Sequence, residues 1–183
     1  MEYSRLVKAE AALRFLAIVL TMATAVLIGT TKETEMVFGV IKETANVHSL
    51  QALVVLLVTH SIATGYLLAQ LCKACLLARS KTSLKSRPSK GLAWISFSMD
   101  QVMAYATFSV TTAATQGCYF AVSGQTQFQW MKLCNIYTRF CDKVAAALLF
   151  GLAASFLLAV VSCISAYNVF RLYPCKRPIA VKG

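Results

Sequence analysis

The chain has 183 residues, of which 58% are hydrophobic and 14% charged, and its mean hydropathy is +0.64. Soluble domains carry about 45–50% apolar and about 25% charged residues, so this composition excludes a soluble globular protein. Lys and Arg number 18 against 7 Asp and Glu, and in a membrane protein such an excess is typical of cytosolic loops. Three prolines and eight glycines leave little material for linkers, so we expect a single domain.

Four apolar stretches are long enough to cross a bilayer, whose core of about 30 Å requires about 20 helical residues. Their apolar residues surround each helix instead of following one stripe, which is typical of helices that face lipid and one another. The sequence therefore predicts an all-α membrane protein, a four-transmembrane-helix bundle. The predicted spans are 11–30, 49–72, 92–116 and 144–170, joined by a basic loop at 73–91 and by loops at 31–48 and 117–143.

Basic residues lie mainly on one side of this bundle. The N-terminal segment, the 73–91 loop and the C-terminal tail hold twelve Lys and Arg, whereas the other two loops hold five together with four acidic residues. Because basic loops remain in the cytosol, both termini are predicted to be cytosolic and the 31–48 and 117–143 loops external. The first span is expected to stay uncleaved, since it contains Arg14 and is long enough to span by itself.

Two charged side chains lie inside the predicted spans, Arg14 in the first and Asp100 in the third. A charge at mid-bilayer costs about 2.5–3.5 kcal/mol on insertion scales, so both groups require partners or water. Both lie in the inner leaflet by the rise per residue, and we predict a structural Arg14–Asp100 ion pair. The alternatives are Arg14 snorkelling to the headgroups beside a neutral Asp100, and a proton or ion pathway.

The sequence carries little that is typical of an enzyme. Cys72-Lys-Ala-Cys75 matches the C-x-x-C of redox and zinc sites, but its loop lacks the second pair or the histidines that a metal site requires. His60, near the middle of the second span, is expected to be packed inside the bundle. We therefore predict no catalytic residue, metal or cofactor. The 73–91 loop has no aromatic residues on which bases could stack, so anionic lipid and not nucleic acid is its expected partner.

Small residues recur four positions apart in every span, a spacing that allows helices to approach closely in lipid. The longest such ridge lies in the fourth span and comprises Ala147, Gly151, Ser155, Ala159 and Cys163. These ridges can all serve to build the bundle itself, but four ridges exceed what one antiparallel bundle requires. We therefore predict that one of them faces another subunit, with the fourth-span ridge as the first choice.

The seven cysteines divide by compartment in this topology. Cys118, Cys134 and Cys141 lie outside, where disulfides persist. A Cys134–Cys141 bond, which closes a short loop, is favoured, and a bond from Cys118 to either of them is the alternative. Three more cysteines lie at the cytosolic boundary, where they are either palmitoylated or reduced: Cys72, Cys75 and Cys175.

Several short motifs occur together along residues 9–172 of this chain. They are Glu10-Ala-Ala-Leu-Arg14, Asp100-Gln-Val-Met-Ala-Tyr105, Trp130 followed by Cys134 and Arg139-Phe-Cys141, and Ser165-Ala-Tyr-Asn-Val-Phe170. In this combination the chain resembles a plant family, the Casparian strip membrane domain proteins and their CASP-like relatives, and more distantly the MARVEL-like four-span proteins. Ala63-Thr-Gly-Tyr66 and Gln70-Leu-Cys72 are similar to the second subgroup of CASP-like proteins.

The resemblance implies four spans in the plasma membrane, cytosolic termini, the intramembrane residues Arg14 and Asp100, and an external pair formed by Cys134 and Cys141. The founding members of the family form stable polymeric platforms in the root endodermis, exclude other membrane proteins and recruit the peroxidase machinery that deposits lignin. Residues 31–48 lack the aromatic-rich signature associated with those members. Membrane scaffolding is therefore expected of this chain, and localisation to a Casparian strip is not.

These observations predict a non-enzymatic plasma-membrane scaffold that oligomerises laterally with itself and with related family members. It would organise a membrane domain or recruit cell-wall-modifying enzymes outside. Its external partner surface is expected at Trp130, Tyr137 and Phe140, although these aromatic residues also fit an interfacial belt. The alternative function is a small channel or transporter that uses Asp100 and Arg14, for which the uncharged fourth span offers no continuous polar path.

Overall fold

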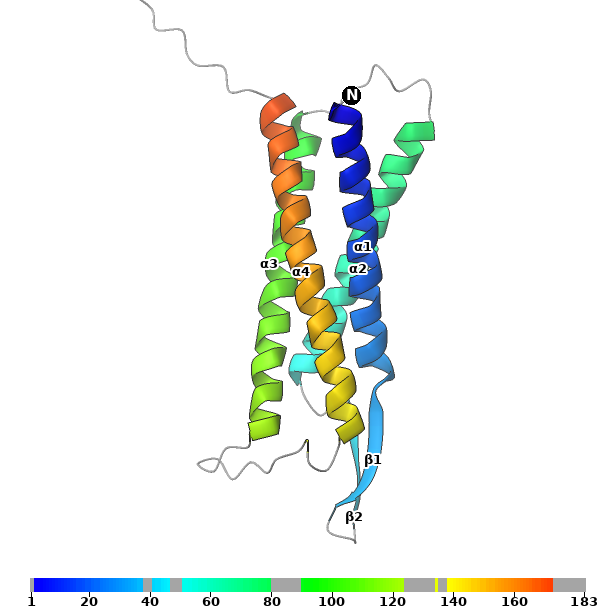
Figure 1. Ribbon diagram of the computed structural model, residues 1–183, viewed down its shortest axis with the longest axis vertical. Helices are drawn as coiled ribbons and strands as arrows, with labels where there is room; N and C mark the ends of the chain where they lie inside the picture. The colour runs from blue at the N-terminus through cyan, green and yellow to red at the C-terminus, as the bar shows by residue number, and fades with distance from the viewer. Residues whose placement is uncertain are drawn as a thin grey trace, which may run out of the picture.

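The computed structural model describes residues 2–37, 41–46, 51–79, 90–123, 134 and 138–172, and within them the side chains of 9–31, 51–76, 91–123, 134 and 139–171. Four long helices form a bundle: α1 (Glu2–Thr30), α2 (Gln51–Arg79), α3 (Lys90–Ser123) and α4 (Thr138–Leu172) (Figure 1). Helix α4 packs against both α1 and α3, and α2 also packs against both of them. The N-terminal end of α1 and the C-terminal end of α4 lie at the same end of the bundle (Figure 1).

The helices extend beyond the predicted spans. Helix α3 continues to Ser123 and α4 begins at Thr138, so both ends of the predicted 117–143 loop are helical. Helix α2 likewise continues to Arg79, into the predicted basic loop. A helix requires only backbone hydrogen bonds and residues of good propensity, and Ala, Leu, Lys and Arg at 73–79 supply these without being uniformly apolar. Hydropathy therefore predicted the end of α1 at Thr30, but it did not predict that α2, α3 and α4 extend into the adjoining loops.

A β-hairpin at the end of α1 departs from the all-α prediction. Strand β1 (Lys32–Val37) pairs antiparallel with β2 (Ile41–Asn46), and Thr34 lies opposite Thr44 in the register. Thr, Val and Ile favour extended backbone, but strands of six residues that carry several charges give no signal in a search for long apolar runs. The hairpin lies at the end of the bundle opposite the beginning of α1 (Figure 1).

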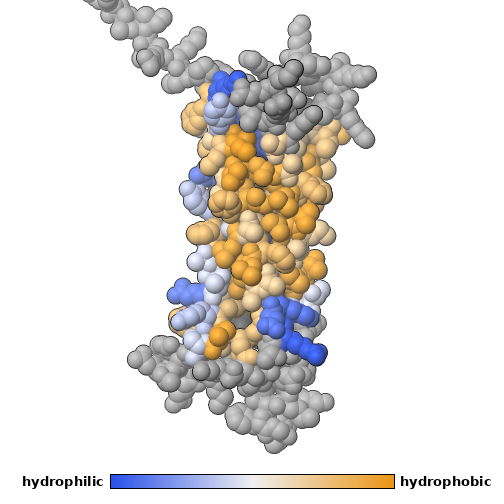
Figure 2. Space-filling model, viewed as in Figure 1, coloured by the Kyte–Doolittle hydropathy of each residue, from blue (hydrophilic) through white to orange (hydrophobic). Residues whose placement is uncertain are grey.

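Three of the described helices are long and apolar enough to cross a membrane, over Ala9–Thr30, Gln51–Leu76 and Arg139–Arg171. On the face shown in Figure 2, an apolar band separates the more polar ends of the bundle. Helix α3, with 34 residues, is about 50 Å long and therefore long enough to span. Its polar residues, Asp100 and Gln101 foremost, keep its apolar stretch less hydropathic than those three segments.

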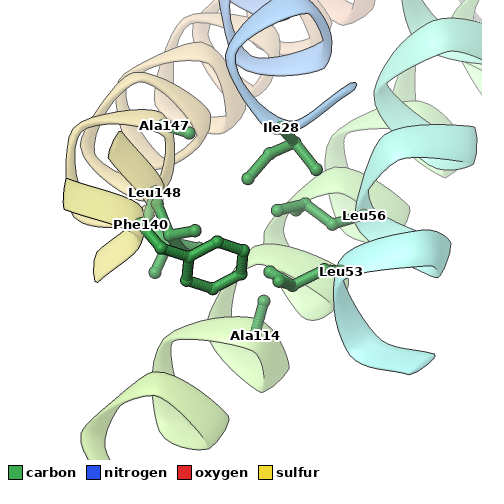
Figure 3. Packing of buried hydrophobic residues seen from close by; sticks show 8 residues of the cluster. Ile28, Leu53, Leu56, Ala114, Phe140, Ala147 and Leu148 are labelled. Atoms are coloured by element: carbon green, nitrogen blue, oxygen red, sulfur yellow. The ribbon is translucent and has the colours of Figure 1, made fainter. Parts of the chain in front are cut away.

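Near the hairpin the bundle is held by a cluster of buried apolar side chains from all four helices. Its labelled members converge in Figure 3: Ile28, Leu53, Leu56, Ala114, Phe140, Ala147 and Leu148. The ring of Phe140 is directed into this cluster and the residue is 8% exposed. The prediction that Phe140 forms part of an external partner surface is therefore wrong, because the first turns of α4 are already packed against the other helices. Trp130 and Tyr137 lie outside the described residues.

Candidate functional site: an intramembrane polar network

The structure places the two charged residues of the predicted spans in direct contact. Arg14 Nη2 on α1 lies 2.9 Å from Asp100 Oδ2 on α3. Asp100 is 1% exposed and Arg14 9% exposed, so bulk water solvates neither charge. A buried charge is stable only when it is paired and its remaining hydrogen-bonding capacity is used. The surroundings of this pair therefore decide its role.

Helix α4 and the first turns of α1 supply part of those surroundings. Ser165 Oγ donates a 2.8 Å hydrogen bond to Asp100 Oδ2, and it also accepts one of 3.3 Å from Arg14 Nη2. Glu10 Oε1 accepts a 2.9 Å hydrogen bond from Arg14 Nη2. The other oxygen of Glu10, Oε2, accepts a 3.1 Å hydrogen bond from Asn168 Nδ2 on α4. The ion pair is thus extended into a network that joins α1, α3 and α4.

Helix α2 completes the network from the other side. The Tyr66 hydroxyl donates a 2.7 Å hydrogen bond to Asp100 Oδ1, the carboxylate oxygen that Arg14 does not contact. Gln70 Nε2 donates to the Tyr66 hydroxyl and to Ser96 Oγ on α3, each at 2.9 Å. Both oxygens of Asp100 are therefore bonded, and the donors come from the three other helices. Hydrogen bonds to an ionised group are about twice as strong as neutral ones, so Asp100 is the centre of the network.

Local sequence spacing explains how each helix presents its polar groups together. Residues four apart lie on one face of a helix, and this spacing relates Glu10 to Arg14, Tyr66 to Gln70 and Ser96 to Asp100. Sequence reasoning found Arg14 and Asp100 because they are charged, but it did not assign a role to their uncharged partners. The signal that would have found these partners is a pair of polar residues four apart within an apolar segment, repeated at the same depth in several spans.

A second polar layer lies further toward the hairpin. His60 is fully buried, as the sequence predicted, and its Nε2 lies 3.1 Å from Thr111 Oγ1. Nearby, Thr64 Oγ1 on α2 donates a 2.9 Å hydrogen bond to Thr21 Oγ1 on α1. A side chain at Gly151 would place its Cβ 3.0 Å from Thr111 Cγ2 and 3.4 Å from His60 Nε2. The absence of a side chain at Gly151 therefore allows α4 to lie against this pair.

The small-residue ridge of α4 does not form a single outward face. Ala147, Gly151 and Ser155 are buried within the bundle, whereas Ala159 and Cys163 are exposed. The prediction of an oligomer face is therefore wrong for the first three residues, which pack against the other helices of the same chain. The reason is geometric: at 3.6 residues per turn, each step of four residues rotates the ridge by about 40° around the helix. A ridge of five members consequently passes from the interior to the outer surface.

The cysteines follow the favoured pairing. Cys134 and Cys141 form a disulfide with a Cα–Cα distance of 5.7 Å, which confirms that prediction over the alternatives with Cys118. Cys118 is free and partly buried against the apolar cluster near the hairpin. Cys72 and Cys75 are free and exposed. Across the described ranges, no group of three or more His, Cys, Asp or Glu side chains is arranged to hold a metal ion.

The apolar helices and the buried ionic network between them define an integral membrane protein built on a helical bundle. The Casparian strip membrane protein domain matches residues 4–172, nearly the whole chain, and the protein belongs to that family.

Its relatives are similar over most of their length. CASP-like protein 2C1 of Vitis vinifera is 43% identical over 172 residues, which cover 94% of this chain and 84% of the relative. CASP-like protein 2C1 of Populus trichocarpa is 42% identical, with 96% of each chain covered, and CASP-like protein 2C2 of Zea mays is 44% identical, with 91% and 90% covered. No solved structure matches the chain.

Proposed function

We propose that this protein is a non-enzymatic scaffold of the plasma membrane, with four transmembrane helices and both termini in the cytosol, which assembles laterally with itself and with related family members. The observation that carries the proposal is the network around Asp100. Its charged and polar groups satisfy one another across all four helices, so it fixes the arrangement of the helices. A fixed arrangement is what a building block of a membrane platform requires.

The fourth span in this proposal is α3. It is long enough to cross the bilayer and packs along α4, and its two most polar residues face partners on neighbouring helices. Asp100 is bonded to groups from the three other helices, and Gln101 accepts a hydrogen bond from Ser162 on α4. Polar residues are tolerated in a spanning helix when neighbouring helices supply hydrogen-bonding partners for them. Together with the charge asymmetry of the loops, this supports cytosolic termini.

The geometry of the network supports a scaffold better than it supports a transport site. A pathway requires polar groups that exchange partners along the whole membrane thickness, whereas Asp100 has both oxygens occupied by fixed donors. Toward the hairpin, the cluster around Leu53 and Leu56 closes the centre of the bundle with apolar side chains. The external segment with Trp130 and Tyr137 would then present the surface for cell-wall-modifying partners.

Lateral mobility in a plant plasma membrane tests the scaffold. A fluorescent fusion of the whole chain is expected to recover slowly after photobleaching, as a large assembly does, and to migrate as a multimer in mild detergent. Asp100→Ala and Arg14→Ala should be retained in the secretory pathway, because the first removes the central acceptor of the network and the second leaves the buried Asp100 carboxylate without its cation. Leu149→Ala, at an exposed position of α4, is the matched control and should behave as the parent. Rapid recovery of the parent together with a monomeric mass would contradict the scaffold.

A further inference from the structure

A groove of about 570 Å³ runs along the outer surface of the bundle between α3 and α4. Its walls include Gln101, Tyr105 and Phe108 from α3, and Phe156, Ala159 and Cys163 from α4. Exposed apolar side chains are ordinary on a surface that faces lipid. The polar groups in the groove are not, because hydrocarbon offers no hydrogen-bonding partner to an exposed amide or hydroxyl.

The amide of Gln101 is only partly matched. Its Nε2 donates a 3.2 Å hydrogen bond to the Tyr105 hydroxyl, and its Oε1 accepts one of 3.2 Å from Ser162 Oγ. A glutamine amide has two N–H donors and two lone pairs on its oxygen. Within the part of the chain that the structure describes, one donor and one acceptor of Gln101 remain unmatched, as does the hydroxyl hydrogen of Tyr105. Tyr105 is 64% exposed, and both Tyr105 and Gln101 line the groove, so these groups are accessible from it.

Depth identifies the kind of partner. Gln101 lies nine residues beyond the start of the predicted third span, and therefore about 13 Å below the membrane surface. At that depth the neighbouring lipid atoms are acyl carbons, and the hydroxyl and carbonyl groups of lipids lie nearer the surface. A partner that matches the Gln101 amide must bring a polar group to this depth on a structure that is otherwise apolar. Another transmembrane helix meets both conditions.

We propose that this groove is the contact between two copies of the protein, related by a two-fold axis along the membrane normal. Such an axis brings the Gln101 residues of the two copies to the same depth, and an amide with one free donor and one free acceptor is complementary to itself. Side-chain amides that bond across helices stabilise association in membranes. The inference rests on the proposed scaffold and specifies its dimer contact: the outer end of the α4 ridge, at Ala159 and Cys163, and the adjoining face of α3.

Cys163 makes the contact testable with a native residue, because it is free, exposed and part of the groove wall. The full chain is prepared in phosphatidylcholine vesicles with the Cys134–Cys141 disulfide retained. Four cysteines are replaced by Ala: Cys72, Cys75, Cys118 and Cys175. Copper phenanthroline or a short bismaleimide should then crosslink Cys163 of one copy to Cys163 of the other. Ala153→Cys in a Cys163→Ala background is the matched control, since Ala153 is exposed on a different face of α4 and should not crosslink.

Two substitutions test the chemistry of the groove. Gln101→Leu removes the self-complementary amide and is expected to raise the dimer dissociation constant about tenfold. Ala159→Trp fills the groove and should abolish the crosslink, whereas Ala153→Trp should leave it unchanged. Helix content by circular dichroism and a monodisperse elution profile establish that each variant is folded. If Gln101→Leu does not fold, the Ala159→Trp and Ala153→Trp pair decides.

Different results would contradict the groove contact and the proposed scaffold. A multimer that persists in every variant and does not crosslink at Cys163 would overturn the groove contact and leave the scaffold with an interface elsewhere. A parent protein that is monomeric in vesicles at all concentrations would overturn both. Crosslinking at Cys163 that is lost in Ala159→Trp and weakened in Gln101→Leu would establish the contact.

Discussion

The two ends of the bundle are held together in different ways. Around Asp100, four helices meet through directional hydrogen bonds and an ion pair whose distances lie between 2.7 and 3.3 Å. Around Leu56, the same four helices meet through apolar side chains that only need to fill space. A directional network permits few alternative arrangements, while an apolar cluster tolerates exchange among side chains of equal volume. The network therefore determines which faces of the helices meet, and the cluster adds packing.

The largest expected effect is a loss of stability in the polar network. It is measured by comparing one substitution in the network with one in the apolar cluster, both of which barely change side-chain volume. Asp100→Asn keeps the shape but removes the charge that Arg14 faces, and should destabilise the fold by about 3 kcal/mol, the lower end for a broken buried pair because Glu10 remains. Leu56→Met in the apolar cluster should cost less than about 1.5 kcal/mol. Unfolding in mixed micelles, titrated with dodecyl sulfate, measures both. Equal losses for the two substitutions would show that the network is no more specific than the cluster.

Removal of one hydrogen bond from Asp100 should have an intermediate effect. Tyr66→Phe deletes the 2.7 Å bond to Oδ1 and the bond that the hydroxyl accepts from Gln70, and it leaves the ring in place. We expect a loss of about 2 kcal/mol, mainly because the acceptor on Asp100 is charged and buried. Tyr119→Phe, at a residue 67% exposed, is the control and should be neutral. The titration with dodecyl sulfate measures the stability of both variants. A Tyr66→Phe protein as stable as the parent would show that water, and not the Tyr66 hydroxyl, bonds to Asp100 Oδ1.

The smallest expected effect concerns the layer midway between the two ends, where α4 approaches α3 closely at Gly151. Gly151→Ala puts a Cβ 3.0 Å from Thr111 Cγ2, and the displacement of α4 should cost about 1 kcal/mol, the lower end for overpacking. At Gly65 nothing lies within 4 Å of an added Cβ, so Gly65→Ala should be neutral or stabilising by up to about 1 kcal/mol through helix propensity. Thermal unfolding in detergent compares the two variants, and a change of the same sign in both would exclude a steric role for Gly151.

Much of the bundle follows from local sequence. Apolar runs predicted the helices because hydropathy over about 20 residues depends only on neighbours along the chain. Arg14 and Asp100 were identifiable for the same reason, since a charge inside such a run is conspicuous by itself. The Cys134–Cys141 disulfide is also local, because its two residues are only seven positions apart. Tyr66, Gln70 and Ser165 were missed as members of the network because each is unremarkable in its own span.

What the sequence by itself determined, then, is the apolar length of the helices, the two buried charges and the local disulfide. The tertiary structure decided which faces of the helices meet. In the folded chain Phe140 points into the core, and the two hairpin strands pair with each other. The α4 ridge is buried from Ala147 to Ser155 and exposed beyond it. The physical reason is that apolar residues surround these helices on every side, so hydropathy carries no information about their rotation. That rotation is determined by contacts between segments far apart in the chain, above all those that satisfy Asp100.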